Sequence, residues 1–166
     1  MKRTALGIAL VAGIITLDQW TKSLVHARFR LGESISIVTD YFNLTYIRNT
    51  GAAFGLLAQA DASFRVPFFI VVPVIALGMI AWMFRQVPKE DWKLALSLVL
   101  VVSGALGNLI DRVARGYVID FLDFHWRYQY HFPAFNVADI AICFGVGGLM
   151  LDLWLRNPDR QRLSSH

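Results

Sequence analysis

The sequence predicts a polytopic α-helical membrane protein with four transmembrane helices, short external β-strands and a short interfacial helix. Composition is the first reason. Hydrophobic residues make up 56% of the 166 residues and charged residues only 17%, whereas soluble domains contain roughly 45–50% and about 25%; the mean hydropathy is +0.49. The second reason is that the apolar residues cluster into four long runs. The composition excludes intrinsic disorder, and a lone cysteine, Cys143, excludes an internal disulfide scaffold.

Four segments are long and apolar enough to cross a bilayer, which requires about 20 residues of helix. They cover residues 4–24, 66–84, 94–112 and 135–155. The first segment also resembles a cleaved signal peptide. However, the polar stretch from Asp18 to Lys22 stands where a cleavage site requires small residues. We therefore expect a retained span and one membrane domain over residues 1–166.

The two longer connections, residues 26–65 and 113–134, contain β-branched and aromatic residues in partial alternation, which is typical of strands. The strands are expected at residues 35–37, 41–47 and 117–126. Residues 58–64 are expected to form the interfacial helix. These connections lie on the same side of a four-span protein.

The distribution of polar residues predicts the orientation in the membrane. The polar candidate residues fall on the side of the two long connections: Asp18, Lys22, Arg48, Asn49, Asn108, Asp111, Arg112, Asp120, Asn136 and Asp139. The other side receives basic residues near both termini and in one short loop: Lys2, Arg3, Arg85, Lys89, Lys93, Arg156, Arg160 and Arg162. Basic residues in short loops mark the cytoplasmic side, so both termini are expected in the cytoplasm. Because the basic residues serve orientation, we expect no nucleic-acid partner.

Asp120 and Asp139 are the strongest candidates for catalysis. Each is surrounded by apolar sequence, with no basic residue within four positions. They stand at opposite ends of one external connection, so they can meet where it folds back onto the spans. Two carboxylates held close together in a dry site do not both ionise, and one pKa rises while the other stays low. Such a pair can take a proton from water and give one to a leaving amine.

Other polar residues have structural explanations of equal standing. Asp18 and Lys22 are four residues apart on one helical face and can form an ion pair at the end of a span. Asp111 is expected to pair with Arg115 by the same spacing.

Two further pairs also have structural explanations. Asn108 and Arg112 can satisfy the end of a helix that packs closely through its glycines. His125 and His131 are expected to be surface residues, because their six-residue separation matches no zinc-site spacing.

Five motifs in order along the chain resemble the lipoprotein signal peptidase family (signal peptidase II), the aspartic proteases of the bacterial inner membrane. They are DQWTK at residues 18–22, NTGAAF at 49–54, GNLIDR at 107–112, VIDF at 118–121 and FNVAD at 135–139. Each motif alone is a weak signal. Together with four spans and a similar chain length, they identify the resemblance.

The resemblance implies four transmembrane helices with a small external β-sheet, the cradle, and a membrane-parallel helix near residues 55–65. By position, Asp120 and Asp139 match the catalytic dyad. The residues that match the lining of the site are Asn49, Asn108, Arg112 and Asn136. Asp18, Lys22 and Asp111 match supporting polar positions. No cofactor and no metal is expected.

The resemblance also implies the substrate and the location. The substrate is expected to be a prolipoprotein whose cysteine carries diacylglycerol, held within the membrane lipid and cleaved just before that cysteine. The protein is then expected in the inner membrane, with its active site at the outer, periplasmic face. Two other classes compete with this interpretation. A transporter places ionisable residues near the middle of the membrane, and a scaffold protein does not require two carboxylates in apolar sequence.

Overall fold

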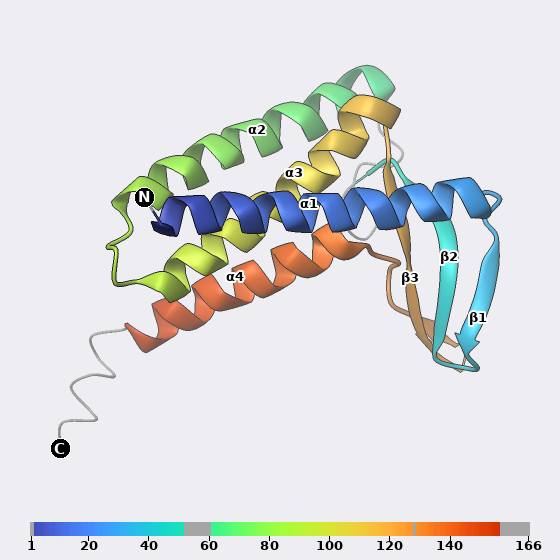
Figure 1. Cartoon of the computed structure of the whole chain (residues 1–166). Helices are drawn as coiled ribbons and strands as arrows, with labels where there is room; N and C mark the ends of the chain where they lie inside the picture. The colour runs from blue at the N-terminus through green and yellow to red at the C-terminus, as the bar shows by residue number, and fades with distance from the viewer. Residues whose placement is uncertain (1, 52–60, 128, 157–166) are drawn as a thin grey trace.

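The computed structural model describes residues 2–51, 61–127 and 129–156. The helices are α1 (Lys2–Arg28), α2 (Ala62–Gln86), α3 (Trp92–Arg115) and α4 (Val137–Leu155), and the strands are β1 (Ser34–Val38), β2 (Phe42–Asn49), β3 (Val118–Trp126) and β4 (Tyr130–His131). The helices form a bundle with the sheet at one end (Figure 1). Four apolar helices with a small antiparallel sheet confirm the predicted fold class. Of the interfacial helix predicted over residues 58–64, residues 58–60 lie outside the described residues, and residues 62–64 belong to α2, which begins at Ala62.

All four helices are long and apolar enough to span a bilayer. Many large apolar side chains point outward from them, such as Val71, Ile75 and Trp82 of α2 and Phe144 and Leu153 of α4. Soluble monomers rarely expose contiguous apolar areas of this kind. The outer surface of the bundle is therefore suited to lipid.

Helix α3 is the centre of the bundle. In the most apolar part of α3, 56% of the residues are buried inside the protein, whereas in the corresponding part of α2 none are. Helices α3 and α4 pack closely through glycines: a Cβ added at Gly104 would collide with the Ala138 carbonyl oxygen, and one at Gly145 would lie 2.7 Å from the Ser97 carbonyl oxygen. Small residues permit this approach in membrane bundles. A Cβ added at Gly147 of α4, by contrast, would meet no neighbour within 4 Å among the described residues.

The sheet has the strand order β1-β2-β3-β4 and every pair is antiparallel. It joins α1 through a small apolar core formed by Val25, Tyr46, Ile119 and Phe121. A further bridge pairs Leu122 of β3 with Phe135, just before α4. The sheet is thus attached both to the end of α1 and to the start of α4.

The junction between helices and sheet places the two candidate aspartates. Helix α3 ends at Gly116, whose φ of 79° is the left-handed conformation that glycine adopts easily, and β3 begins two residues later. Asp120 therefore lies near the start of β3, just after the end of α3. Helix α4 starts after the N-cap Asn136, which places Asp139 in its first turn. The start of α1 and the end of α4 lie at the opposite end of the molecule (Figure 1).

Candidate active site

Asp120 lies in β3 and is almost completely buried, with 2% of its surface exposed. Its Oδ2 accepts a hydrogen bond from the Asn49 amide of β2 at 3.0 Å. Its Oδ1 accepts one from the Asn136 amide at 2.7 Å. Both oxygens of this carboxylate are thereby held in fixed directions by donors from two different elements.

Asp139 is positioned by the cap of α4. The Asn136 side chain accepts from the Asp139 backbone N–H at 3.0 Å, and the Asp139 Oδ2 accepts from the Asn136 backbone N–H at 3.1 Å. This reciprocal arrangement is a capping box, which satisfies helix N–H groups that have no partner within the helix. The other oxygen, Oδ1, accepts from the Asn108 amide of α3 at 2.8 Å. The carboxylate is therefore fixed by one side-chain amide and one backbone N–H.

Asn136 connects the two carboxylates. Its amide group donates to Asp120, while its oxygen and backbone bind Asp139. The side chain is fully buried, and its amide also lies 3.3 Å from the Asn108 Oδ1 and from the Ile119 carbonyl oxygen. One asparagine thus holds both acids at a single point between β3, α3 and α4.

The pKa of Asp120 is raised to about 6, mainly because the carboxyl group is buried and also because Asp139 carries a negative charge nearby. Hydrogen bonds from Asn49 and Asn136 oppose the rise, as does the positive charge of Lys22. The ordinary value is 3.8, so the environment shifts this carboxyl strongly toward its protonated form. A pair of acids that shares one proton near neutral pH is suited to acid–base catalysis.

Arg112 borders the same site on the side of α2. One guanidinium nitrogen lies 3.2 Å from the Gly51 carbonyl oxygen and the other 3.4 Å from the Asn108 carbonyl oxygen. Its charged group also lies over the Phe69 ring, 5.2 Å from the ring centre. A small pocket opens here between α2 and α3, lined in part by Thr50, Phe69 and Arg112. This is a positively charged opening beside the two acids.

A buried network of charged residues from α1 and α3 lies next to the two acids. The Lys22 Nζ lies 2.8 Å from Asp18, 3.0 Å from Asp111 and 3.0 Å from the Asn108 Oδ1. Lys22, Asp18 and Asp111 have essentially no exposed surface. The predicted ion pairs of Asp18 with Lys22 and of Asp111 with Arg115 are both present. Through Asn108, this network reaches Asp139.

The structure therefore brings all nine predicted site residues into one connected network. Gln19 is a member that the sequence reasoning missed: its amide lies 3.1 Å from Asp18, 3.1 Å from the Gly107 carbonyl oxygen and 3.2 Å from Asp111. Its place inside the DQWTK motif was the available signal. A hydrogen bond from the Ala138 backbone N–H to the Asp18 Oδ1, at 2.9 Å, ties the same network to the start of α4.

The expectation that His125 is a surface residue is wrong. It lies in β3 with 6% of its surface exposed, and its ring stacks against the His131 ring of the adjacent strand β4. His131, by contrast, has a half-exposed side chain.

Comparison with known proteins gives one consistent result. The family model described as signal peptidase (SPase) II matches residues 10–155. A protein of Geobacter sulfurreducens named lipoprotein signal peptidase is 53% identical over 145 residues, covering 87% of this chain and 89% of its own length. One of Syntrophotalea carbinolica with the same name is 50% identical over 141 residues, covering 85% and 86%.

Solved structures agree with these relatives. One described as a bacterial membrane enzyme superimposes with a TM-score of 0.83 at 30% identity, covering 93% of this chain and 91% of its own. A second of the same description gives a TM-score of 0.82 at 29% identity, covering 92% and 94%. Sequence, fold and membrane-spanning helices all point to the same group of enzymes. The chain therefore belongs to the signal peptidase II family and is an aspartic-type membrane peptidase.

Proposed function

We propose that this protein removes the signal peptide from prolipoproteins, with Asp120 and Asp139 as its catalytic pair. The observation that supports this most directly is that one buried asparagine, Asn136, binds both carboxylates. The relatives at about half identity are named lipoprotein signal peptidases, which supplies the class of substrate.

In the proposed reaction, the ionised member of the pair accepts a proton from a water molecule that attacks the scissile carbonyl. The protonated member gives its proton to the peptide as the tetrahedral intermediate forms and collapses to acid and amine. Water is consumed and the two carboxyl groups again hold one proton between them. Because the two acids interact, their pKa values belong to the pair and the proton is not assigned to either residue.

The other network residues have proposed roles around this pair. Asn49, Asn108 and Asn136 orient the carboxylates through hydrogen bonds of 2.7 to 3.0 Å. Arg112 is proposed to hold the substrate backbone at the neighbouring pocket. The buried network of Asp18, Lys22 and Asp111 keeps Asn108 and the start of α4 in place.

A diacylglyceryl-modified precursor is the proposed substrate, and cleavage is expected just before the modified cysteine. Each buried CH₂ of an acyl chain contributes about 0.8 kcal/mol to membrane binding, so two chains keep the scissile bond at the membrane surface. The purified enzyme in lipid vesicles is expected to cut the lipidated precursor at least a hundredfold faster than the same unlipidated sequence. Gel mobility and product mass measure this. Equal rates on the two precursors would show that the enzyme does not recognise the lipid. Failure to cleave either precursor would overturn the proposed function.

The site is proposed to face the periplasm of the inner membrane, with both termini in the cytoplasm. Arg85, Lys89 and Lys93 lie at the end of the bundle away from the sheet, and basic residues in short loops favour the cytoplasm. In a Cys143→Ser background, a membrane-impermeant maleimide added to intact cells is expected to label Leu31→Cys but not Lys89→Cys. The reverse labelling would contradict this orientation.

A further inference from the structure

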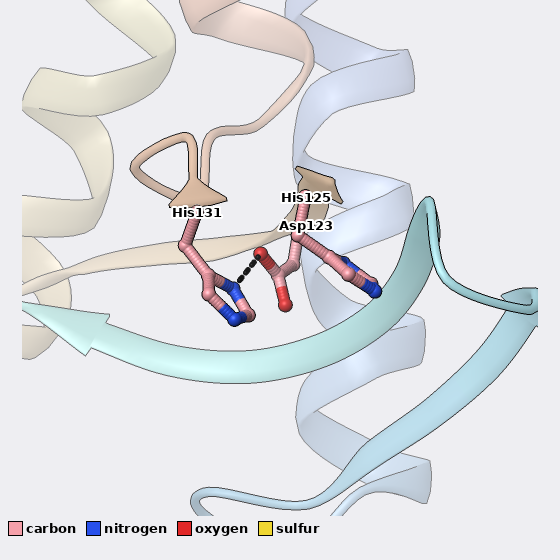
Figure 2. Close-up of side chains that lie close together, drawn as sticks. All are labelled: Asp123, His125 and His131. Atoms are coloured by element: carbon pink, nitrogen blue, oxygen red, sulfur yellow. Dashed lines mark hydrogen bonds and ion pairs between the residues drawn. The ribbon is translucent and has the colours of Figure 1, made fainter. Parts of the chain in front are cut away.

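Three side chains at the far end of the sheet form a compact cluster that the proposed reaction does not use. Asp123 and His125 come from β3 and His131 from β4 (Figure 2). One ligand atom from each lies within 4.8 Å of the other two. The His131 Nδ1 lies 3.3 Å from the Asp123 Oδ1, and the two imidazole rings are stacked with their centres 5.0 Å apart.

Strand geometry explains why these residues meet. Asp123 and His125 are two residues apart on one strand, so their side chains point to the same face. His131 is the direct cross-strand partner of His125 in the β3–β4 hairpin. The six-residue separation of the histidines is therefore produced by a tight hairpin. Zinc-site spacings are characteristic of loops and helix turns, which is why the spacing alone gave no signal.

Two imidazoles and one carboxylate are a common donor set for zinc. Zn²⁺ binds His nitrogen and Asp oxygen at about 2.0–2.2 Å, and sites with three protein ligands leave a fourth position for water. Ligand atoms at those distances are separated by roughly 3.3 Å in a tetrahedral site, which is the separation already present between Asp123 and His131. The ligand atom of His125 lies within 4.8 Å of the other two, so zinc binding requires this ring to move closer to them.

A buried amide beside the cluster is a second, independent observation. Asn43 of β2 is the cross-strand partner of Asp123, and its amide nitrogen lies 3.5 Å from the Asp123 Oδ2. Only 7% of Asn43 is exposed, and within the described part of the chain its Oδ1 has no hydrogen-bond partner. Buried polar atoms are normally satisfied. A metal-bound water, or the amide oxygen itself after a flip of the side chain, would meet that requirement.

We propose that Asp123, His125 and His131 bind one Zn²⁺ ion that fastens the β3–β4 hairpin. Strand β4 has only two residues, and such a short pairing is marginally stable by itself. A metal that binds the folded hairpin more tightly than the unfolded chain stabilises it. Asp120 accepts hydrogen bonds from Asn49 and Asn136, whereas Asp123 contacts Asn43 and His131. The zinc site is therefore separate from the catalytic pair.

The test uses the untagged full-length enzyme in detergent, freed of metal with a chelator and then titrated with Zn²⁺ against a chromophoric competitor. We expect one equivalent of tight binding and a higher Tm for the zinc-loaded protein. Co²⁺ is expected to give visible d–d absorption bands typical of nitrogen and oxygen ligands in a four- or five-coordinate site. Absence of stoichiometric binding in the wild type would overturn the proposal.

Variants locate the site. His131→Gln and Asp123→Asn are each expected to weaken Zn²⁺ binding at least tenfold and to remove the Co²⁺ bands. His26→Gln is the matched control, because this histidine lies on α1 and bonds Tyr46; its zinc affinity is expected to equal that of the wild type. Circular dichroism verifies that each variant is folded. Unchanged zinc affinity in folded His131→Gln and Asp123→Asn would show that the metal binds elsewhere and would refute this site.

Discussion

Replacing either Asp120 or Asp139 with asparagine is expected to reduce the rate of precursor cleavage by about 10³-fold or more. Asparagine keeps the size of aspartate and one acceptor oxygen, but it neither accepts a proton from water nor supplies one to the leaving amine. Loss of a positioned acid or base costs typically 10²–10⁴-fold. The two carboxylates act as one unit, so the double variant is expected to be little slower than either single variant.

The measurement is the initial rate on a diacylglyceryl-modified precursor at equal amounts of folded enzyme. Asp40→Asn is the matched control. Asp40 stands in the β1–β2 turn with a positive φ of 69°, a conformation that asparagine also accepts, and its activity is expected to equal that of the wild type. If Asp120→Asn or Asp139→Asn retains near-normal activity, the dyad assignment is wrong.

Comparing the pH dependence of stability in the wild type and in Asp120→Asn tests the effect of ionising Asp120. The folded pKa of Asp120 is raised from 3.8 to about 6, so the folded protein binds this proton more tightly than the unfolded chain does. The ionised group therefore destabilises the folded state above about pH 6, and that penalty disappears as the pH falls toward 4. At about 1.4 kcal/mol per pKa unit, the penalty is on the order of 2–3 kcal/mol.

The Tm of the wild type is accordingly expected to fall more between pH 5 and pH 8 than the Tm of Asp120→Asn, which has no ionisable group at this position. Intrinsic fluorescence during heating in detergent measures this. The same pH dependence in both proteins would show that ionisation of Asp120 does not destabilise the folded state.

Lys22→Met is expected to lower the free energy of unfolding by about 3–5 kcal/mol. The Lys22 ammonium is fully buried between Asp18 and Asp111. Removing it leaves two carboxylates in a dry site, with Arg115 beside only Asp111. Breaking a buried ion pair by deleting one partner carries a penalty of this size, because the remaining charge has lost its compensation.

Thermal unfolding in detergent and the steady-state amount in membranes measure the effect. Lys93→Met is the control, since Lys93 is an exposed lysine at the start of α3, and it is expected to change stability by less than about 0.5 kcal/mol. Adding Asp18→Asn to Lys22→Met is expected to restore part of the loss, because one of the two carboxylates is then neutral. A stable Lys22→Met protein would show that the network contributes little to folding.

The helices and the main strands were predictable because local sequence determines them. Long uncharged runs such as residues 66–84 leave no alternative to a membrane span, and alternation at residues 117–126 matches β3 closely. Asp120 and Asp139 stood out for a similar reason: an acid in apolar sequence without a basic neighbour requires an explanation.

The connections within the site were not predictable from spacing. Asn136 is both the N-cap of α4 and the link between the acids, and neither role is visible without knowing that β3 folds back beside α4. Lys22 was expected to pair with Asp18, its neighbour one helical turn away, but its contact with Asp111 joins α1 to α3 across 89 residues of sequence.

The sequence by itself determined the membrane class, the four spans and the pair of acids, because hydropathy and isolated charges are properties of single segments. Tertiary structure alone decided which groups are in contact: Asn136 with two carboxylates, Lys22 with three partners, and His125 with the stacked ring of His131 across a hairpin. Those contacts depend on how helix ends and strands meet. Side chains far apart in sequence come within hydrogen-bond distance only after the bundle has packed and the sheet has found its register.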